Sequence, residues 1–333
     1  MTDWTLLGHE ATDELRCPTG ERQPLVRATS AATAAPSDAP GVDLVCPRPA
    51  EPRLRRRETC TSCCSQITSE GEGGTVGDEL LAAGRSRNGP DHISTLRIAC
   101  WVGADWLKVH RLDEAIELLT DTFERGKKHA PTADHPTWLS GHLLAFTHTA
   151  AGHLEEAVVL GREVLAARRG LHGPDHVFTL MTACCLGANL RDTQHMSEAI
   201  ALLTDALRRG QRNAPDKDWP TWSTGYELTL TLAVAGRLSE AAEVGAEVFA
   251  ARRRLFGPDD MGTVGAAWNL AAILRQTGRF DAAIELLAGT YDRARRSASG
   301  EQEPILTLGY GLAATLARAG RLDETVCRGF RHA

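Results

Sequence analysis

The sequence predicts an all-α fold, a right-handed superhelical solenoid of six helix-turn-helix repeats. A column of small residues recurs every 42 residues, a second apolar column keeps the same interval, and each repeat holds two stretches of helical period. The small column comprises Ala115, Ala157, Ala199, Ala241, Ala283 and Thr325. The apolar column, thirteen residues earlier, comprises Val102, Leu144, Leu186, Leu228, Leu270 and Leu312.

Each repeat predicts one helical hairpin, and the units span residues 89–130, 131–172, 173–214, 215–256, 257–298 and 299–333. Glycines such as Gly152 and Gly278 stand where the first helix needs a left-handed residue to end. Asp113, Ser197 and Asp281 stand at the expected N-cap of the second helix. Residues 73–88 match the second helix of unit two and predict a degenerate repeat remnant. Residues 1–72 predict a disordered, low-complexity tail.

Composition excludes several classes of protein. Apolar residues make up 42% of the 333 residues and charged residues 24%, so most of the chain can fold around a core. No apolar run approaches the roughly 20 residues of a membrane-spanning helix, and the first residues do not resemble a signal peptide. The nine cysteines follow no regular disulfide spacing. We therefore expect a cytoplasmic protein.

The residues that connect the hairpins resemble a known family. Glycine precedes the second helix, and loops with Gly-Pro-Asp-His at Gly89 and Gly173 continue into Thr-Leu. This pattern resembles tetratricopeptide repeats, and the 42-residue period resembles the kinesin light chain-like subtype. The resemblance covers residues 89–333 approximately. The Asn-Asn-Leu-Ala sequence usual in that subtype is approached only in unit five, at Trp268–Ala271.

The resemblance implies that the first helices line a concave groove that holds a peptide. Transferring that geometry to this chain gives a groove of aromatic, cationic and amide side chains, which suit peptide capture. The predicted groove residues are Arg97, Trp101, Lys108, His142, Phe146, Arg191, Tyr226, Glu227, Trp268, Asn269, Arg275 and Tyr310. The alternative for the aromatic residues is packing between adjacent helices.

Other patterns favour structural roles. Pairs such as Asp91-His92 and Asp175-His176 could act as acid–base dyads or metal ligands, but their fixed place in each loop indicates turn and capping roles. Cys60, Cys63 and Cys64 lack the second ligand pair that a zinc site requires, so we expect no metal and no cofactor. Glycine-rich residues 71–77 lack the Lys of a phosphate-binding loop, and no hydrolase motif occurs, so we expect no enzyme.

The sequence therefore predicts a non-catalytic scaffold or adaptor whose partner is a protein or peptide. We expect no membrane partner and no nucleic acid, since basic residues at the ends of the second helices are explained by the helix dipole. The last repeat has no capping helix, which leaves self-association open. The alternative is a sensor or regulatory repeat module, or fragment, of a bacterial signal-transducing ATPase or transcriptional regulator, because similar arrays often serve there.

Overall fold

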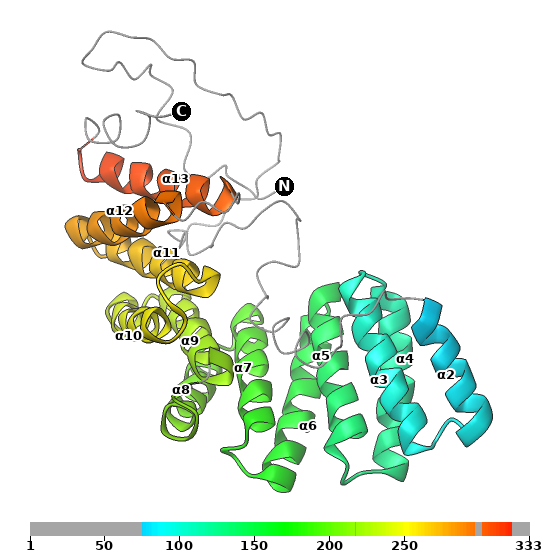
Figure 1. Ribbon diagram of the computed structural model, residues 1–333. Helices are drawn as coiled ribbons and strands as arrows, with labels where there is room; N and C mark the ends of the chain where they lie inside the picture. Colours follow the sequence, from blue (N-terminus) through cyan, green and yellow to red (C-terminus); the bar gives the residue numbers. More distant parts are fainter. Residues whose placement is uncertain (1–74, 217, 297–301, 322–333) are drawn as a thin grey trace. The chain divides into compact units, whose positions relative to one another are not determined.

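The computed structural model describes residues 75–216, 218–296 and 302–321, which form twelve α-helices and no strand (Figure 1). The all-α prediction is confirmed. The tail of residues 1–72 and the second helix of unit six lie outside the described residues. In order, the helices are α2 (Thr75–Asn88), α3 (Ile93–Lys108), α4 (Leu112–His129), α5 (Leu139–Ala151), α6 (Leu154–His172), α7 (Val177–Asp192), α8 (Met196–Asn213), α9 (Ser223–Val234), α10 (Leu238–Phe256), α11 (Met261–Gln276), α12 (Phe280–Arg296) and α13 (Gln302–Arg318). Single wide turns, η2 (Asp134–Trp138) and η3 (Asp218–Trp222), precede α5 and α9.

The helices fall into two compact parts that divide within α10. In the part that ends at Val244, each helix from α2 to α9 packs against the next one in sequence. In the part that begins at Gly245, α11 packs on α12 and α12 packs on α13. Consecutive helices therefore pair as the 42-residue repeat predicts.

The two repeating columns form the seam of each hairpin. The apolar column is buried in all six units, and its leucines include Leu186, which is 2% exposed. A fully buried alanine lets the two helices of a hairpin approach closely. Complete burial is found at Ala115, Ala157, Ala199, Ala241 and Ala283.

The turn inside each hairpin uses one left-handed residue, at the same position of every unit. Gly152, Gly236, Gly278 and Gly320 have φ angles of 87°, 75°, 74° and 72°, as the sequence predicts for a helix C-terminus. Units one and three place His110 and Gln194 at this position, with φ angles of 63° and 66°. Residues with a Cβ pay a steric penalty in that conformation, so these two turns are strained.

The predicted N-caps of the second helices are wrong by two residues. α4, α6 and α8 begin directly after the turn, with Arg111, His153 and His195 as N-caps, and none of the three caps through its side chain. Asp113 lies inside the first turn of α4, next to Glu114. There the carboxylates stabilise the positive end of the helix dipole instead of capping a backbone N–H.

In units one to four, one position near the end of the second helix alternates between glycine and arginine. In units one and three, a Cβ at Gly126 or Gly210 would lie 2.7 or 2.6 Å from the hydroxyl of Thr137 or Thr221, so only glycine fits. In units two and four the same position holds Arg168 or Arg252, which are 1% and 8% exposed. Two kinds of hairpin therefore alternate over these four units, and unit five has Ala294 at this position.

Candidate functional site

Within each of the two parts, the first helices of successive units lie side by side and form a layer. α3 contacts α5, α5 contacts α7, and α7 contacts α9, while α11 contacts α13 in the second part. All twelve residues of the predicted groove lie on these first helices. The layer is therefore the surface on which to look for the predicted site.

In the part that ends at Val244, the exposed residues of the predicted groove lie on α3. Trp101 is 45% exposed, and its ring meets the edge of the His135 ring at a centroid distance of 6.1 Å. Arg97, one turn before it, and Lys108, at the end of α3, are exposed as well. α3 thus presents an indole between two cations, a combination suited to an apolar side chain with a carboxylate nearby.

The two predicted residues of α5 lie in the core. Phe146 is 4% exposed and packs with Cys100, Leu107 and Leu143. His142 is 2% exposed. Burial, helped by the Arg168 charge, lowers the pKa of His142 to about 3, so the ring is neutral in the folded chain.

A buried ion pair links α7 to α9. The Arg191 guanidinium donates to Glu227 at 2.6 Å and to Asp192 at 3.0 Å, and the Arg191 and Glu227 side chains are 10% and 3% exposed. Burial acts to lower the pKa of Arg191, but the two carboxylates outweigh it and raise that pKa overall. Arg191 and Glu227 therefore join neighbouring units, with Tyr226 half-buried beside them in sequence.

In the second part, Trp268, Asn269 and Arg275 are buried on α11, and Tyr310 is 40% exposed on α13. The Trp268 ring occupies the space that a Cβ on Gly311 would need, so α13 approaches α11 closely at a glycine. The Asn269 amide nitrogen and oxygen have no hydrogen-bond partner within the residues described. A buried amide of this kind is expensive unless something satisfies it.

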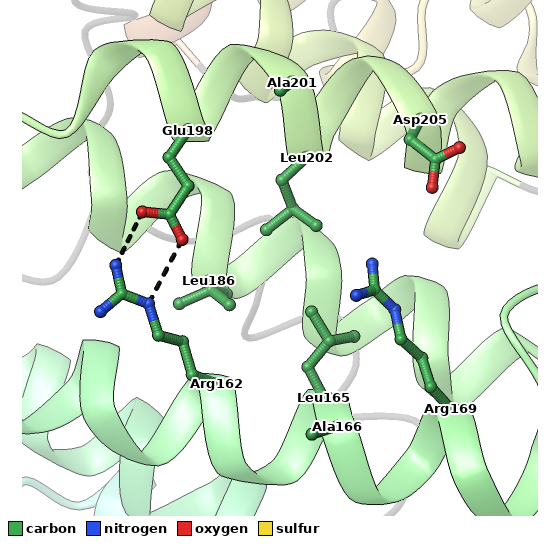
Figure 2. A pocket seen from close by; sticks show the side chains of 9 residues that line it. All are labelled: Arg162, Leu165, Ala166, Arg169, Leu186, Glu198, Ala201, Leu202 and Asp205. Atoms are coloured by element: carbon green, nitrogen blue, oxygen red, sulfur yellow. Dashed lines mark hydrogen bonds and ion pairs between the residues drawn. The ribbon is translucent and has the colours of Figure 1, made fainter.

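A groove that the sequence does not reveal lies between the second helices α6 and α8 (Figure 2). It has a volume of about 430 Å³. Its lining residues are Arg162, Leu165, Ala166 and Arg169 from α6, Leu186 from α7, and Glu198, Ala201, Leu202 and Asp205 from α8. The 42-residue columns could not indicate it, because they describe one repeat and not the gap between two.

In units one to three, the loop before the first helix is bonded to the second helix of the same hairpin. The backbone N–H groups of Ser94 and Phe178 donate to Nδ1 of His92 and His176, at 3.2 and 3.3 Å. These histidines are helix caps, as predicted. The aspartates accept from an arginine 34 residues further on, in the second helix of the same unit. The pairs are Arg125 with Asp91 at 2.7 Å, Arg168 with Asp134 at 2.9 Å, and Arg209 with Asp175 at 2.8 Å.

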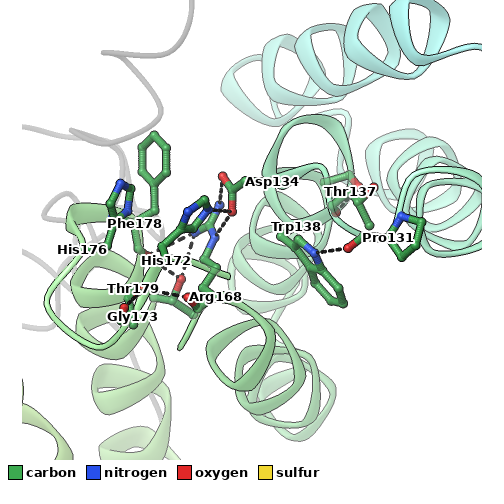
Figure 3. A network of polar contacts seen from close by, with 12 residues as sticks. Pro131, Asp134, Thr137, Trp138, Arg168, His172, Gly173, His176, Phe178 and Thr179 are labelled. Carbon is green, nitrogen blue, oxygen red and sulfur yellow. Dashed lines mark hydrogen bonds and ion pairs between the residues drawn. The ribbon is translucent and has the colours of Figure 1, made fainter. Parts of the chain in front are cut away.

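The Asp134 loop has the densest network (Figure 3). Arg168 donates to both Asp134 oxygens, to the Thr182 hydroxyl at 2.9 Å and to the Phe178 carbonyl at 3.3 Å. The His172 ring lies 3.3 Å from Asp134 and stacks on His176 with centroids 4.4 Å apart. The Asp134 carboxylate is thus held by Arg168 and His172 of α6, which supports a structural role.

The Cys100 thiol is buried and shows no sign of reactivity. Burial raises the pKa of the Cys100 thiol to about 12, and its Sγ donates to the Pro136 carbonyl at 3.4 Å. No cluster of three potential metal ligands occurs in residues 75–216, 218–296 and 302–321. Cys60, Cys63 and Cys64 lie outside the described residues.

Two family models match the chain where the hairpins stack. Both describe the tetratricopeptide repeat, one over residues 137–212 and the other over residues 263–301. The chain is a tetratricopeptide repeat protein. Such repeats are generally protein–protein interaction modules and are typically non-catalytic. No curated protein sequence matches this tetratricopeptide repeat protein significantly.

Solved structures share the fold of this tetratricopeptide repeat chain at low identity. A kinesin light chain-related protein of Podospora anserina with nearly identical TPR-like repeats has a TM-score of 0.55 and 23% identity, over 62% of this chain and 99% of its own. BtubC (BKLC) from P. vanneervenii has a TM-score of 0.56 and 17% identity, over 65% and 87%. Yeast Tom70 has a TM-score of 0.50 and 14% identity, over 84% and 50%.

None of the helices in the described part of the chain has the length and apolarity needed to cross a bilayer.

Proposed function

We propose that this protein is a non-catalytic scaffold that binds a protein segment on the layer of first helices. The observation that carries this proposal is Trp101, a large aromatic side chain left 45% exposed between Arg97 and Lys108. Exposed tryptophans flanked by cations are typical anchors of protein interfaces, because they bury a large apolar area at low cost in side-chain entropy.

The buried residues of the same layer support the proposal in a different way. The Arg191–Glu227 ion pair holds α7 to α9 in the part that also contains Trp101. A rigid layer keeps Trp101 in place before the partner arrives, which lowers the entropic cost of binding. We assign direct contact with the partner to Arg97, Trp101 and Lys108, and a supporting role to the buried groove residues of the same part.

The partner that fits this surface is a peptide with an apolar residue followed or preceded by acidic ones. Arg97 and Lys108 lie on both sides of Trp101 along α3, so carboxylates on the peptide can pair with them while its apolar side chain covers the indole. A cytoplasmic location and self-association through the last repeat stay predictions.

Selection from a displayed peptide library against the full chain tests this function. Peptides that bind the groove should lose roughly 30-fold in affinity with Trp101→Ala, since an aromatic anchor is worth about 2 kcal/mol. Val159→Ala is the matched control, because Val159 is 64% exposed on the second helix α6. Equal binding of every selected peptide to wild type and Trp101→Ala would contradict the proposal.

A further inference from the structure

The groove between α6 and α8 has two walls of opposite charge. On α6, Arg162 and Arg169 stand seven residues apart, and on α8, Glu198 and Asp205 stand seven residues apart (Figure 2). Seven residues are two helical turns, or about 10.5 Å. Small or apolar residues lie between the charges on both walls, and Leu186 forms the floor.

An ion pair between the two walls spans one end of this groove, and the charges at the other end do not pair across it. Arg162 donates to both Glu198 oxygens, at 2.7 and 3.3 Å, and both side chains are about half exposed. At the other end, the Arg169 guanidinium has no ion pair within the described residues, and Asp205 accepts from Arg209 of its own helix at 2.8 Å. The exposed bridge is worth little energy, so a ligand can displace it.

In the gap between the preceding second helices, α4 and α6, an ion pair spans the position that is unbridged between α6 and α8. Between α4 and α6, Lys127 occupies the position of Arg169 and donates to Glu163, at the position of Asp205, at 3.3 Å. Phe123 and Glu124 stand where α6 has Leu165 and Ala166, so larger side chains line that gap. The groove between α6 and α8 therefore differs from the gap between α4 and α6.

We propose that this groove binds a single amphipathic α-helix of a partner protein, in addition to the segment bound on the first helices. The charges on each wall repeat every two turns, which matches a helix lying parallel to α6 and α8 and not an extended strand. The fitting helix carries an apolar ridge at positions i, i+3 or i+4 and i+7, acidic residues on the flank that faces α6, and basic residues on the flank that faces α8.

Three designed peptides of about 20 residues test this inference with the full chain. All share an alanine-rich helical sequence with a leucine ridge, and they differ only in the flanks: glutamate on one and lysine on the other, glutamate on both, or lysine on both. Anisotropy of the fluorescent peptides should show the mixed peptide binding at least 10-fold more tightly than either single-charge peptide.

Two variants locate the binding. Ala201→Trp fills the groove at an exposed position and should weaken the mixed peptide at least 10-fold. Arg169→Glu places acidic residues on both walls at the unbridged end of the groove, next to Asp205, and should shift the preference toward the peptide with lysine on both flanks. Arg208→Glu is the matched control, since Arg208 is exposed on α8 outside the groove, and it should change affinity less than 2-fold.

Three results would overturn the proposal. The first is that the mixed peptide fails to bind or binds no better than the other two. The second is that Ala201→Trp leaves its affinity unchanged. The third is that the chain alone sediments as a dimer that Ala201→Trp dissociates, which would assign the groove to a second copy of this protein.

Discussion

Replacing Arg168 with methionine should destabilise the protein by about 3–5 kcal/mol, the cost of breaking a buried ion pair from one side. Arg168 is 1% exposed, and the Asp134 side chain that it holds is 11% exposed. Methionine fills much of the same space but removes the guanidinium that donates to Asp134 and Thr182, while the Phe178 carbonyl still accepts from the Thr182 hydroxyl at 2.9 Å. Most of the loss then comes from the unpaired Asp134 carboxylate.

Arg209→Met is the matched control for this variant. Arg209 makes the same kind of contact, with Asp175 and Asp205 at 2.8 Å, but its side chain is 26% exposed and the two carboxylates are about half exposed. An exposed pair of this kind is worth about 1 kcal/mol or less. Asp134→Asn should recover part of the stability when it is added to Arg168→Met, because it removes the buried charge.

The assay is urea unfolding of the full chain at neutral pH, followed by circular dichroism. Equal losses of stability in Arg168→Met and Arg209→Met would refute the reasoning, because burial would then not decide the value of these ion pairs. A double variant with Asp134→Asn that is no more stable than Arg168→Met would refute the assignment of the loss to the stranded carboxylate.

Three further predictions follow from single positions. His142 has a folded pKa of about 3 against an ordinary value of 6.5, so the unfolded chain takes up the proton first and acidification costs stability. The loss of unfolding free energy should reach about 2 kcal/mol between about pH 7.5 and about pH 5. The urea midpoint of His142→Gln should change less with pH than that of the wild type, and an equal change in both proteins would contradict this prediction. Gln194→Gly should raise the free energy of unfolding by up to about 1 kcal/mol, because Gln194 has a φ of 66°. A lower free energy of unfolding would show that its side chain matters more than its backbone. Gly187→Val should cost about 1–3 kcal/mol in the same assay, since a Cβ there already lies 2.5 Å from Leu203, and no loss would mean that this seam can repack.

The sequence predicted the hairpins well because the residues that decide them lie within one repeat. Ala199 and Leu186 are buried by their own hairpin and its neighbour, and their type recurs in register. The turn at Gly152 was also predictable, since few residues other than glycine adopt its left-handed conformation without strain. The starts of the second helices were missed because a turn followed directly by a helix needs no side-chain cap.

The candidate site was harder to predict, because exposure depends on the neighbouring repeat. Trp101 and Trp268 come from the same part of the first helix, yet Trp101 is 45% exposed and Trp268 is 8% exposed. Gly311, 43 residues after Trp268, allows α13 to cover the second ring. The pairing of Arg191 with Glu227 also joins two different repeats, so a pattern read within one repeat does not reveal it.

The alternation of Gly126, Arg168 and Gly210 near the end of the second helices limits how such a chain can lengthen or shorten. A recombination event that removed one 42-residue unit would set two hairpins of the same kind side by side. With unit three deleted, for example, Arg168 would meet Thr221 at an interface where even a Cβ does not fit. Events that add or remove 84 residues keep both interfaces intact. Between units one and four, the pair of hairpins is therefore the shortest length that can be added or removed without changing either interface, although the sequence pattern repeats with every single hairpin.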